Sequence, residues 1–96
     1  VRHDIPVIGV VGNDAGWTQI ERDQVEYLNN DIGTQLDYSG YENVATSLGA
    51  EGLFIKQPED IGAVMLKAKN LAKSGKPVLI NCKIGKTDFR KGSISM

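Results

Sequence analysis

The residues best suited to chemistry follow an apolar run near the start of the chain. Residues 7–11 are apolar apart from one glycine, and the loop after them carries an amide at Asn13 and a carboxylate at Asp14, flanked by Gly12 and Gly16. Glycines let the backbone approach a ligand closely, and these side-chain oxygens suit a hard cation that bridges to a phosphate group. The same residue types are the commonest in turns, so by residue type alone a plain strand-to-helix turn is the commoner explanation.

Three apolar runs predict the strands of a sheet. They cover residues 5–11, 53–55 and 77–84. Helical patterns separate them, and the order strand, helix, helix, strand, helix, strand predicts an α/β fold with a parallel sheet and right-handed crossover helices. Ligands of such sheets bind beyond the carboxyl ends of the strands, and the loop at residues 12–17 directly follows the first of them.

The predicted helices begin and end at recognisable residues. Thr18, with Glu21 three residues later, has the spacing of a capping box for the first helix. Apolar residues at helical spacing predict a short helix over residues 41–48. The third helix begins at residues 57–60, where a proline and two acids favour a helix start, and Gly75 closes it. Its predicted apolar stripe consists of Ile61, Val64, Met65, Ala68, Leu71 and Ala72.

Composition and charge exclude several classes of protein. The 96 residues carry a formal net charge of -1 with interspersed signs, which gives no signal for nucleic acid. No apolar run reaches the roughly 20 residues of a membrane span. The single Cys82 rules out a disulfide framework and is expected to be a buried structural thiol, and His3 has no second His or Cys near it. Because residues 1–4 look like the end of a helix and three strands bury little core, we expect residues 1–96 to be the C-terminal part of one domain of a longer protein.

Residues 10–17, with Gln24 downstream, resemble the second half of the motif by which thiamine-diphosphate-dependent enzymes bind their cofactor. Within that family the chain is most similar to the acetolactate synthase-like 2-hydroxyacyl-CoA lyases, which carry a similar Gly-Asn-Asp-Ala loop. The resemblance spans essentially the whole chain and implies the C-terminal part of a Rossmann-like, three-layer cofactor-binding domain. The later matching motifs are Tyr-Glu-Asn-Val-Ala and Leu-Gly-Ala within residues 41–50, Glu-Asp-Ile at 59–61 and Gly-Lys-Pro-Val-Leu-Ile at 75–80.

The resemblance also implies how Mg²⁺ would bridge the cofactor diphosphate to this loop. In the family the ion is bound by the Asp of a Gly-Asp-Gly motif, by the second residue of an Asn-Asn pair and by a backbone carbonyl two residues further on. If Asn13 and Asp14 correspond to the pair, Asp14 is the side-chain ligand and Gly16 the carbonyl donor. If Gly12 and Asn13 do, Asn13 is the ligand and Ala15 the donor. The spacing to later residues slightly favours the first alignment, and both stay open.

Either alignment departs from Asn-Asn. An Asp ligand adds a negative charge beside the diphosphate, which is acceptable because Mg²⁺ binds one or two carboxylates together with phosphate oxygens. Trp17 either lines the cofactor or substrate cleft or is a core anchor. The ending at residues 87–90 resembles that of the lyases, and the basic side chains of Lys86, Arg90 and Lys91 are interpreted as a solvated terminus rather than a contact for a coenzyme A phosphate.

The implied activity is a carbon–carbon lyase that uses thiamine diphosphate and Mg²⁺ to cleave a 2-hydroxyacyl-CoA into an aldehyde and formyl-CoA. This segment would anchor the diphosphate and carry no catalytic residue, so the isolated chain is predicted to be inactive. The alternatives are an acetolactate synthase or 2-oxoacid decarboxylase type reaction on the same cofactor, and a non-catalytic α/β interaction module. The resemblance further implies a homodimer or homotetramer of the parent chain, and an intracellular location with a membrane anchor to the endoplasmic reticulum as one option.

Overall fold

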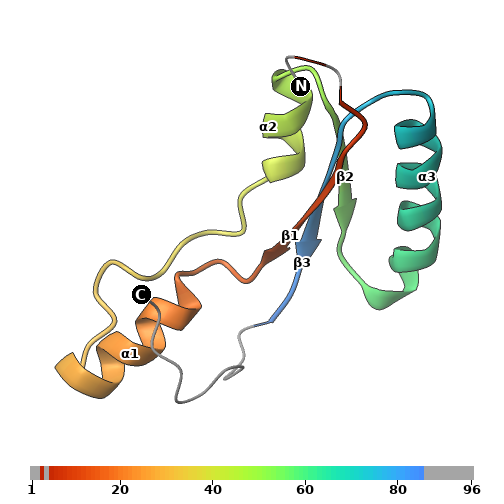
Figure 1. Cartoon of the computed structure of the whole chain (residues 1–96). Coiled ribbons are helices and arrows are strands. Elements are labelled where there is room, and N and C mark those ends of the chain that lie inside the picture. Colours follow the sequence, from red (N-terminus) through yellow and green to blue (C-terminus); the bar gives the residue numbers. More distant parts are fainter. Residues whose placement is uncertain (1–2, 4, 86–96) are drawn as a thin grey trace. The chain divides into compact units, whose positions relative to one another are not determined.

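The computed structural model describes residue 3 and residues 5–85, and there it has the α/β fold that the sequence predicts. The described residues form two units, one comprising residues up to 13 with 40–84 and the other residues 14–39 with 85. The motif at 87–90, the basic tail and most of the expected helix end at 1–4 lie outside the described residues. The elements follow the predicted order: β1 (Ile8–Asn13), α1 (Thr18–Leu28), α2 (Tyr41–Ser47), β2 (Glu51–Ile55), a 3-10 turn (Pro58–Asp60), α3 (Ile61–Lys73) and β3 (Val78–Lys83) (Figure 1).

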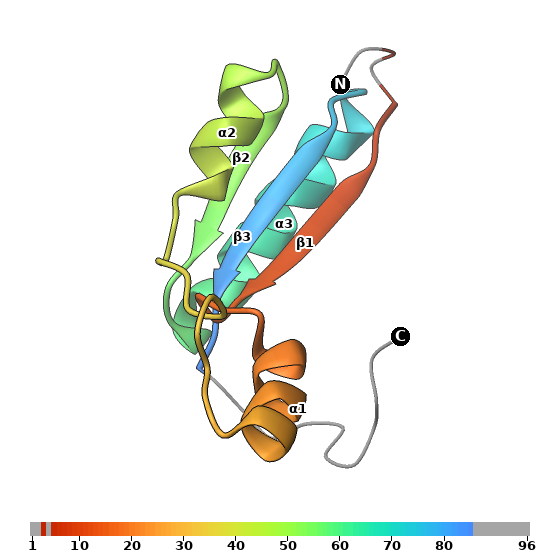
Figure 2. The same ribbon diagram turned by 90° about the vertical axis from the view of Figure 1, so that its left-hand side faces the viewer.

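The first unit holds the sheet, whose described strands lie in the order β1-β3-β2. β3 pairs in parallel with both neighbours, so that Val78 lies opposite Ile8 on one side and opposite Glu51 on the other. Parallel neighbours need crossover connections, and α2 and α3 cover opposite faces of the sheet (Figure 2). All three strands therefore direct their carboxyl ends to the same edge, where Asn13 ends β1 and lies opposite Lys83.

The hydrophobic core of this unit lies between the sheet and α3. Ile80 on β3 and Ala68 on α3 are fully buried, and Val78 and Ile55 are nearly so. The predicted apolar stripe of α3 packs against them through Val64, Met65 and Leu71. Cys82 joins the same cluster but is half-buried, less than the full burial predicted for it. Because alternate residues of a strand face opposite sides, the neighbours Leu79 and Asn81 face away from this core.

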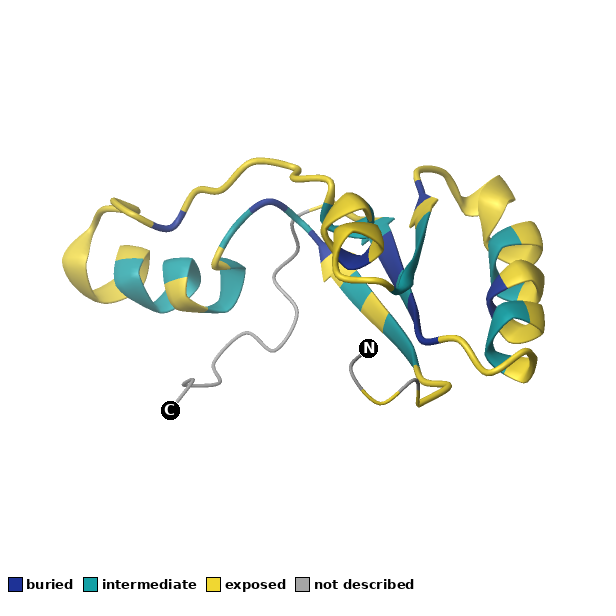
Figure 3. Cartoon of the chain, turned by 90° about the horizontal axis from the view of Figure 1, so that it is seen from above, coloured by how far each residue is buried: buried dark blue, intermediate teal, exposed yellow. Residues whose placement is uncertain are grey.

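The second unit consists of α1 and a segment that returns along the loop before it. An antiparallel bridge joins Gly16 to Gln35, and its backbone hydrogen bonds, both 2.8 Å, run from the Trp17 N–H to the Thr34 carbonyl and from the Leu36 N–H to the Ala15 carbonyl. The sequence predicts only an irregular polar stretch there. Helix α1 has no buried residue in this structure (Figure 3), and none of the described helices is long and apolar enough to cross a membrane.

The first strand differs from its predicted bounds of 5–11 at both ends. Before it, the Val7 N–H donates to the Ile5 carbonyl at 2.8 Å, which folds these residues into a tight turn. At the other end the pairing with β3 continues through Asn13, whose carbonyl accepts the Ile84 N–H at 2.9 Å. Asn13 is therefore a strand residue, and the loop begins at Asp14. Of the other strands, β2 begins two residues earlier than predicted and β3 is one residue shorter at each end.

The predicted capping box at the start of α1 is wrong. Trp17 occupies the N-cap position, its carbonyl accepts the Glu21 N–H at 2.7 Å, and Thr18 is the first helical residue. A capping box is present instead before α3, where the Gln57 N–H donates to the Asp60 carboxylate at 3.3 Å. The hydroxyl of Thr18 is thereby left to bond a residue of the preceding loop.

Candidate functional site

Asn13, the first of the two candidate ligands, points into the sheet unit. Its side chain is buried, and its Nδ2 donates a hydrogen bond of 3.2 Å to Oδ1 of Asn81. The Asn81 Nδ2 in turn donates to Oε1 of Glu42 at 2.9 Å. Because β1 keeps its pairing to its last residue, the position of Asn13 is set by both its backbone and its side chain.

Asp14, the second candidate ligand, opens the loop of the other unit. Its carboxylate is half-buried, and its Oδ2 accepts a hydrogen bond of 2.5 Å from the Thr18 hydroxyl. Thr18 lies four residues on, in the first turn of α1, so the helix start holds one carboxylate oxygen of Asp14 in place. The partners of metal-binding side chains orient them in the same way.

The turn that follows Asp14 has an unusual backbone. Ala15 adopts a φ of 58°, in the left-handed region that non-glycine residues seldom occupy, and its side chain is buried. The flanking hydrogen bonds to Thr34 and Leu36 hold this conformation. Backbone outliers of this kind cost about 1–3 kcal/mol and cluster at functional sites, so the turn is a candidate site on structural grounds as well.

The two carbonyl donors proposed from the sequence differ in their surroundings. The Ala15 carbonyl accepts the Leu36 N–H at 2.8 Å, whereas no backbone N–H of the described residues donates to the Gly16 carbonyl. A carbonyl that already accepts a backbone N–H keeps only one lone pair for a further ligand. The Gly16 carbonyl is therefore the better of the two as a metal ligand.

Trp17 and Gln24 differ in their hydrogen bonds and in what remains predicted of them. The Trp17 side chain is 56% exposed, so it is not a core anchor of the described structure, and its place in a cofactor or substrate cleft stays a prediction. Gln24 is exposed on α1, where its Nε2 donates to the Asn30 side chain and to the Ile32 carbonyl. Gln24 is therefore a surface residue that bonds the segment following α1.

In residues 3 and 5–85, no three His, Cys, Asp or Glu side chains come together as a metal site. A cation at the loop would have one carboxylate from Asp14, the Gly16 carbonyl, and otherwise oxygens from a ligand or from water. Such a ligand set suits Mg²⁺, which keeps several waters and is usually bound through one or two carboxylates plus phosphate oxygens. The residues present therefore fit a magnesium ion that is shared with a phosphate group.

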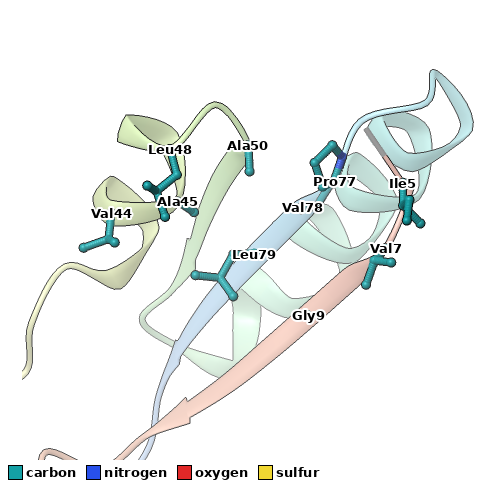
Figure 4. A pocket seen from close by; sticks show the side chains of 10 residues that line it. All are labelled: Ile5, Val7, Gly9, Val44, Ala45, Leu48, Ala50, Pro77, Val78 and Leu79. Carbon is teal, nitrogen blue, oxygen red and sulfur yellow. The ribbon is translucent and has the colours of Figure 1, made fainter. Parts of the chain in front are cut away.

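A separate apolar cavity of about 480 Å³ lies in the sheet unit, on the α2 side of β1 and β3 (Figure 4). Its lining residues, all apolar or glycine, include Val7 just before β1, Leu79 on β3, Val44 on α2 and Leu48 directly after that helix. It lies toward the amino ends of the strands, and none of its side chains could orient a charged cofactor. This cavity is therefore not a candidate for the diphosphate site.

Comparison with known proteins identifies the class. Residues 1–82 match the family model "Thiamine pyrophosphate enzyme, C-terminal TPP binding domain", so the chain belongs to that family. Among curated relatives it is 46% identical to 2-hydroxyacyl-CoA lyase 2 of Mus musculus and 47% identical to that of Homo sapiens, in each case over 100% of this chain and 16% of the relative. It is also 34% identical to sulfoacetaldehyde acetyltransferase of Alcaligenes xylosoxydans xylosoxydans, over 83% of this chain and 14% of that protein. The chain thus spans about a sixth of the length of the lyases that it matches.

These findings confirm the predicted family and fold, and they test no individual site residue. Sequence reasoning missed Thr18 and Asn81, the hydrogen-bond partners of the two candidate ligands, and Glu42, the further partner of Asn81. A signal existed for one of them, because Asn81 interrupts an apolar strand, where a polar side chain needs a specific partner.

Proposed function

We propose that this chain forms part of the thiamine diphosphate and Mg²⁺ site of a carbon–carbon lyase, with the Asp14 carboxylate and the Gly16 carbonyl as metal ligands. The observation that carries the proposal is the strained turn at Ala15, which follows the carboxyl end of β1 in a member of this cofactor-binding family. Asn13 and the Ala15 carbonyl, the ligands of the other alignment, already have protein partners. This supports the alignment in which Asp14 and Gly16 bind the ion.

In this proposal the chain anchors the cofactor and does not itself react. Asp14 and Gly16 hold the metal and through it the diphosphate, and Thr18 fixes the rotamer of Asp14. Trp17, next to Gly16, would lie beside the cofactor. Bound thiamine diphosphate supplies the carbon nucleophile and the electron sink of the reaction. No Gly-Asp-Gly segment occurs in the 96 residues, so the isolated chain is expected to be inactive.

The proposed reaction is cleavage of a 2-hydroxyacyl-CoA between C1 and C2, which gives formyl-CoA and an aldehyde shortened by one carbon. Relatives named 2-hydroxyacyl-CoA lyase 2 support this choice. A reaction on a 2-oxoacid, of the acetolactate synthase or decarboxylase type, stays the second candidate, since the similarity to a sulfoacetaldehyde acetyltransferase shows that relatives of this chain differ in their reactions. We further propose that the parent protein is a homodimer or homotetramer. Its proposed location is intracellular, with an anchor to the endoplasmic reticulum as an option.

The test is product analysis with the full-length protein. The protein is incubated with thiamine diphosphate, Mg²⁺ and either a 2-hydroxyacyl-CoA or pyruvate, and the thioesters, aldehydes and acetolactate are separated by chromatography. Formyl-CoA with an equal amount of aldehyde supports the lyase. Acetolactate or acetaldehyde from pyruvate alone would favour the second candidate. A folded protein that neither binds the cofactor nor turns over either substrate would instead be an interaction module.

Replacing Thr18 by valine is expected to raise the Mg²⁺ concentration for half-saturation about tenfold at fixed thiamine diphosphate, because partners of metal ligands typically contribute 10–100-fold to metal affinity. Valine keeps the shape of threonine and removes the hydroxyl that holds Asp14. Thr18→Ser keeps the hydroxyl and is expected to bind Mg²⁺ like the wild type. Calorimetric titration measures both variants. Equal Mg²⁺ requirements for Thr18→Val and wild type would contradict a role for this hydrogen bond.

A further inference from the structure

The central strand carries a polar side chain that the core does not need. Asn81 is 1% exposed and lies in the middle of the sheet, opposite Val11 on β1 and opposite Phe54 on β2. A buried amide without partners costs about 1–3 kcal/mol by mutational measures, so its partners must be supplied. An aliphatic side chain at this position would carry no such requirement. The amide therefore calls for an explanation beyond packing.

Both ends of the Asn81 amide have a partner. Its Oδ1 accepts from Asn13, at the end of β1, and its Nδ2 donates to the carboxylate of Glu42, in the first turn of α2. By strand alternation and register, Asn13 and Asn81 face away from the core against α3, and α2 covers that opposite face of the sheet (Figure 2). The result is a line of three polar side chains, Glu42–Asn81–Asn13, that runs across that face to the last residue before Asp14.

The Glu42 end of this line is fixed by close packing. The Glu42 carbonyl accepts a hydrogen bond of 3.0 Å from the Thr46 hydroxyl. Its oxygen lies so close to Gly52 on β2 that a Cβ there would come within 1.9 Å of it. The backbone of Glu42 is thus held against the sheet, which keeps its carboxylate within reach of Asn81.

We propose that Glu42, Asn81 and Asn13 are positioning residues, which set the orientation of the chain where it leaves β1 and thereby the placement of the Asp14 ligand. The inference rests on the proposed cofactor site. Asn13 is held by strand pairing and by its side chain, and Asp14 follows it through a single peptide unit. Loss of the bond to Asn81 removes one of the contacts that hold Asn13 and loosens the start of the turn, which metal binding must then order.

The experiment compares Asn81→Leu with a polarity swap in the full-length protein. Asn81→Leu removes both hydrogen bonds, and Asn81→Asp alone places a carboxylate against that of Glu42. Adding Glu42→Gln to Asn81→Asp restores the line, because the new glutamine amide donates to the new carboxylate while Asn13 still donates to its other oxygen. Mg²⁺ binding at fixed thiamine diphosphate is measured by calorimetry, and melting temperatures are measured without ligands.

Each single variant is expected to raise the Mg²⁺ concentration for half-saturation about tenfold, in the range usual for partners of metal ligands, and the double variant to return it close to wild type. Ile80→Val is the matched control, because the Ile80 side chain packs in the core against α3, on the face of the sheet opposite to the Asn81 side chain. It should lower the melting temperature without changing the Mg²⁺ requirement.

The outcomes separate the inference from the proposal on which it rests. If wild type and all variants bind Mg²⁺ and cofactor equally, Asn81 only stabilises the sheet and the inference is overturned alone. The same conclusion follows if the double variant stays as weak as Asn81→Asp. If folded wild type binds no thiamine diphosphate, the proposed function and this inference both fail. Should Asn81→Leu not fold, the comparison of Asn81→Asp with the double variant still decides.

Discussion

Asp14→Ala is expected to weaken Mg²⁺-dependent binding of thiamine diphosphate by more than about 100-fold, because removing a direct ligand costs more than removing an outer partner, for which 10–100-fold is usual. Alanine leaves the ion with the Gly16 carbonyl and no side chain from this loop. The measurement is calorimetric titration of thiamine diphosphate into the full-length protein at saturating Mg²⁺.

Two comparisons make this result specific. Asp14→Asn keeps an oxygen donor at the same place and recreates the Asn-Asn pair of the family motif, so we expect it to bind the cofactor with at most about a tenfold loss. Asn13→Ala removes the ligand of the other alignment. If Asn13→Ala abolished binding while Asp14→Ala bound normally, Asn13 and the Ala15 carbonyl would be the ligands instead.

Loss of folding is not the expected cause of the Asp14→Ala defect. Asp14 is half-buried, and the substitution removes the hydrogen bond from the Thr18 hydroxyl, which is worth about 1.5–3 kcal/mol for a charged acceptor. A melting temperature measured without cofactor checks this, and a strongly destabilised variant would be replaced by Asp14→Ser.

The order and type of the elements could be predicted because each leaves a local pattern. The apolar runs and the stripe of α3 follow from which residues face the core, and both are found as predicted. The end of β1 could not be predicted from the run itself, because Gly12 and Asn13 are turn-forming residues. They are strand residues here because β3 continues beside them to Lys83.

The candidate site could be predicted only in part, because contacts between distant residues again decide the outcome. Asn13 and Asp14 are adjacent and chemically alike, so the sequence left open which of them faces a ligand. The two differ in their hydrogen-bond partners. Asn13 binds Asn81, which lies far along the chain, and Asp14 binds the hydroxyl of Thr18, which the sequence assigned to capping α1 instead. The bridge between Gly16 and Gln35, which supports the turn, joins residues with no periodic pattern around them.

Gly52→Ala is expected to destabilise the protein by about 3 kcal/mol or more, at the upper end of what overpacking costs. A Cβ on Gly52 would lie 1.9 Å from the carbonyl oxygen and 2.6 Å from the carbonyl carbon of Glu42. Both are backbone atoms, so no side-chain rotation relieves the overlap and α2 must move away from β2. Urea unfolding of the full-length protein measures the loss.

Gly62→Ala is the matched control for this prediction. Gly62 lies inside α3, and a Cβ there would meet no described atom within 4 Å. Alanine is the better helix former by about 1 kcal/mol, so this variant is expected to be as stable as the wild type or more so. Because displacement of α2 also moves Glu42 away from Asn81, Gly52→Ala should in addition raise the Mg²⁺ requirement of whatever fraction remains folded. Equal unfolding midpoints for the two alanine variants would show that α2 does not pack on Gly52.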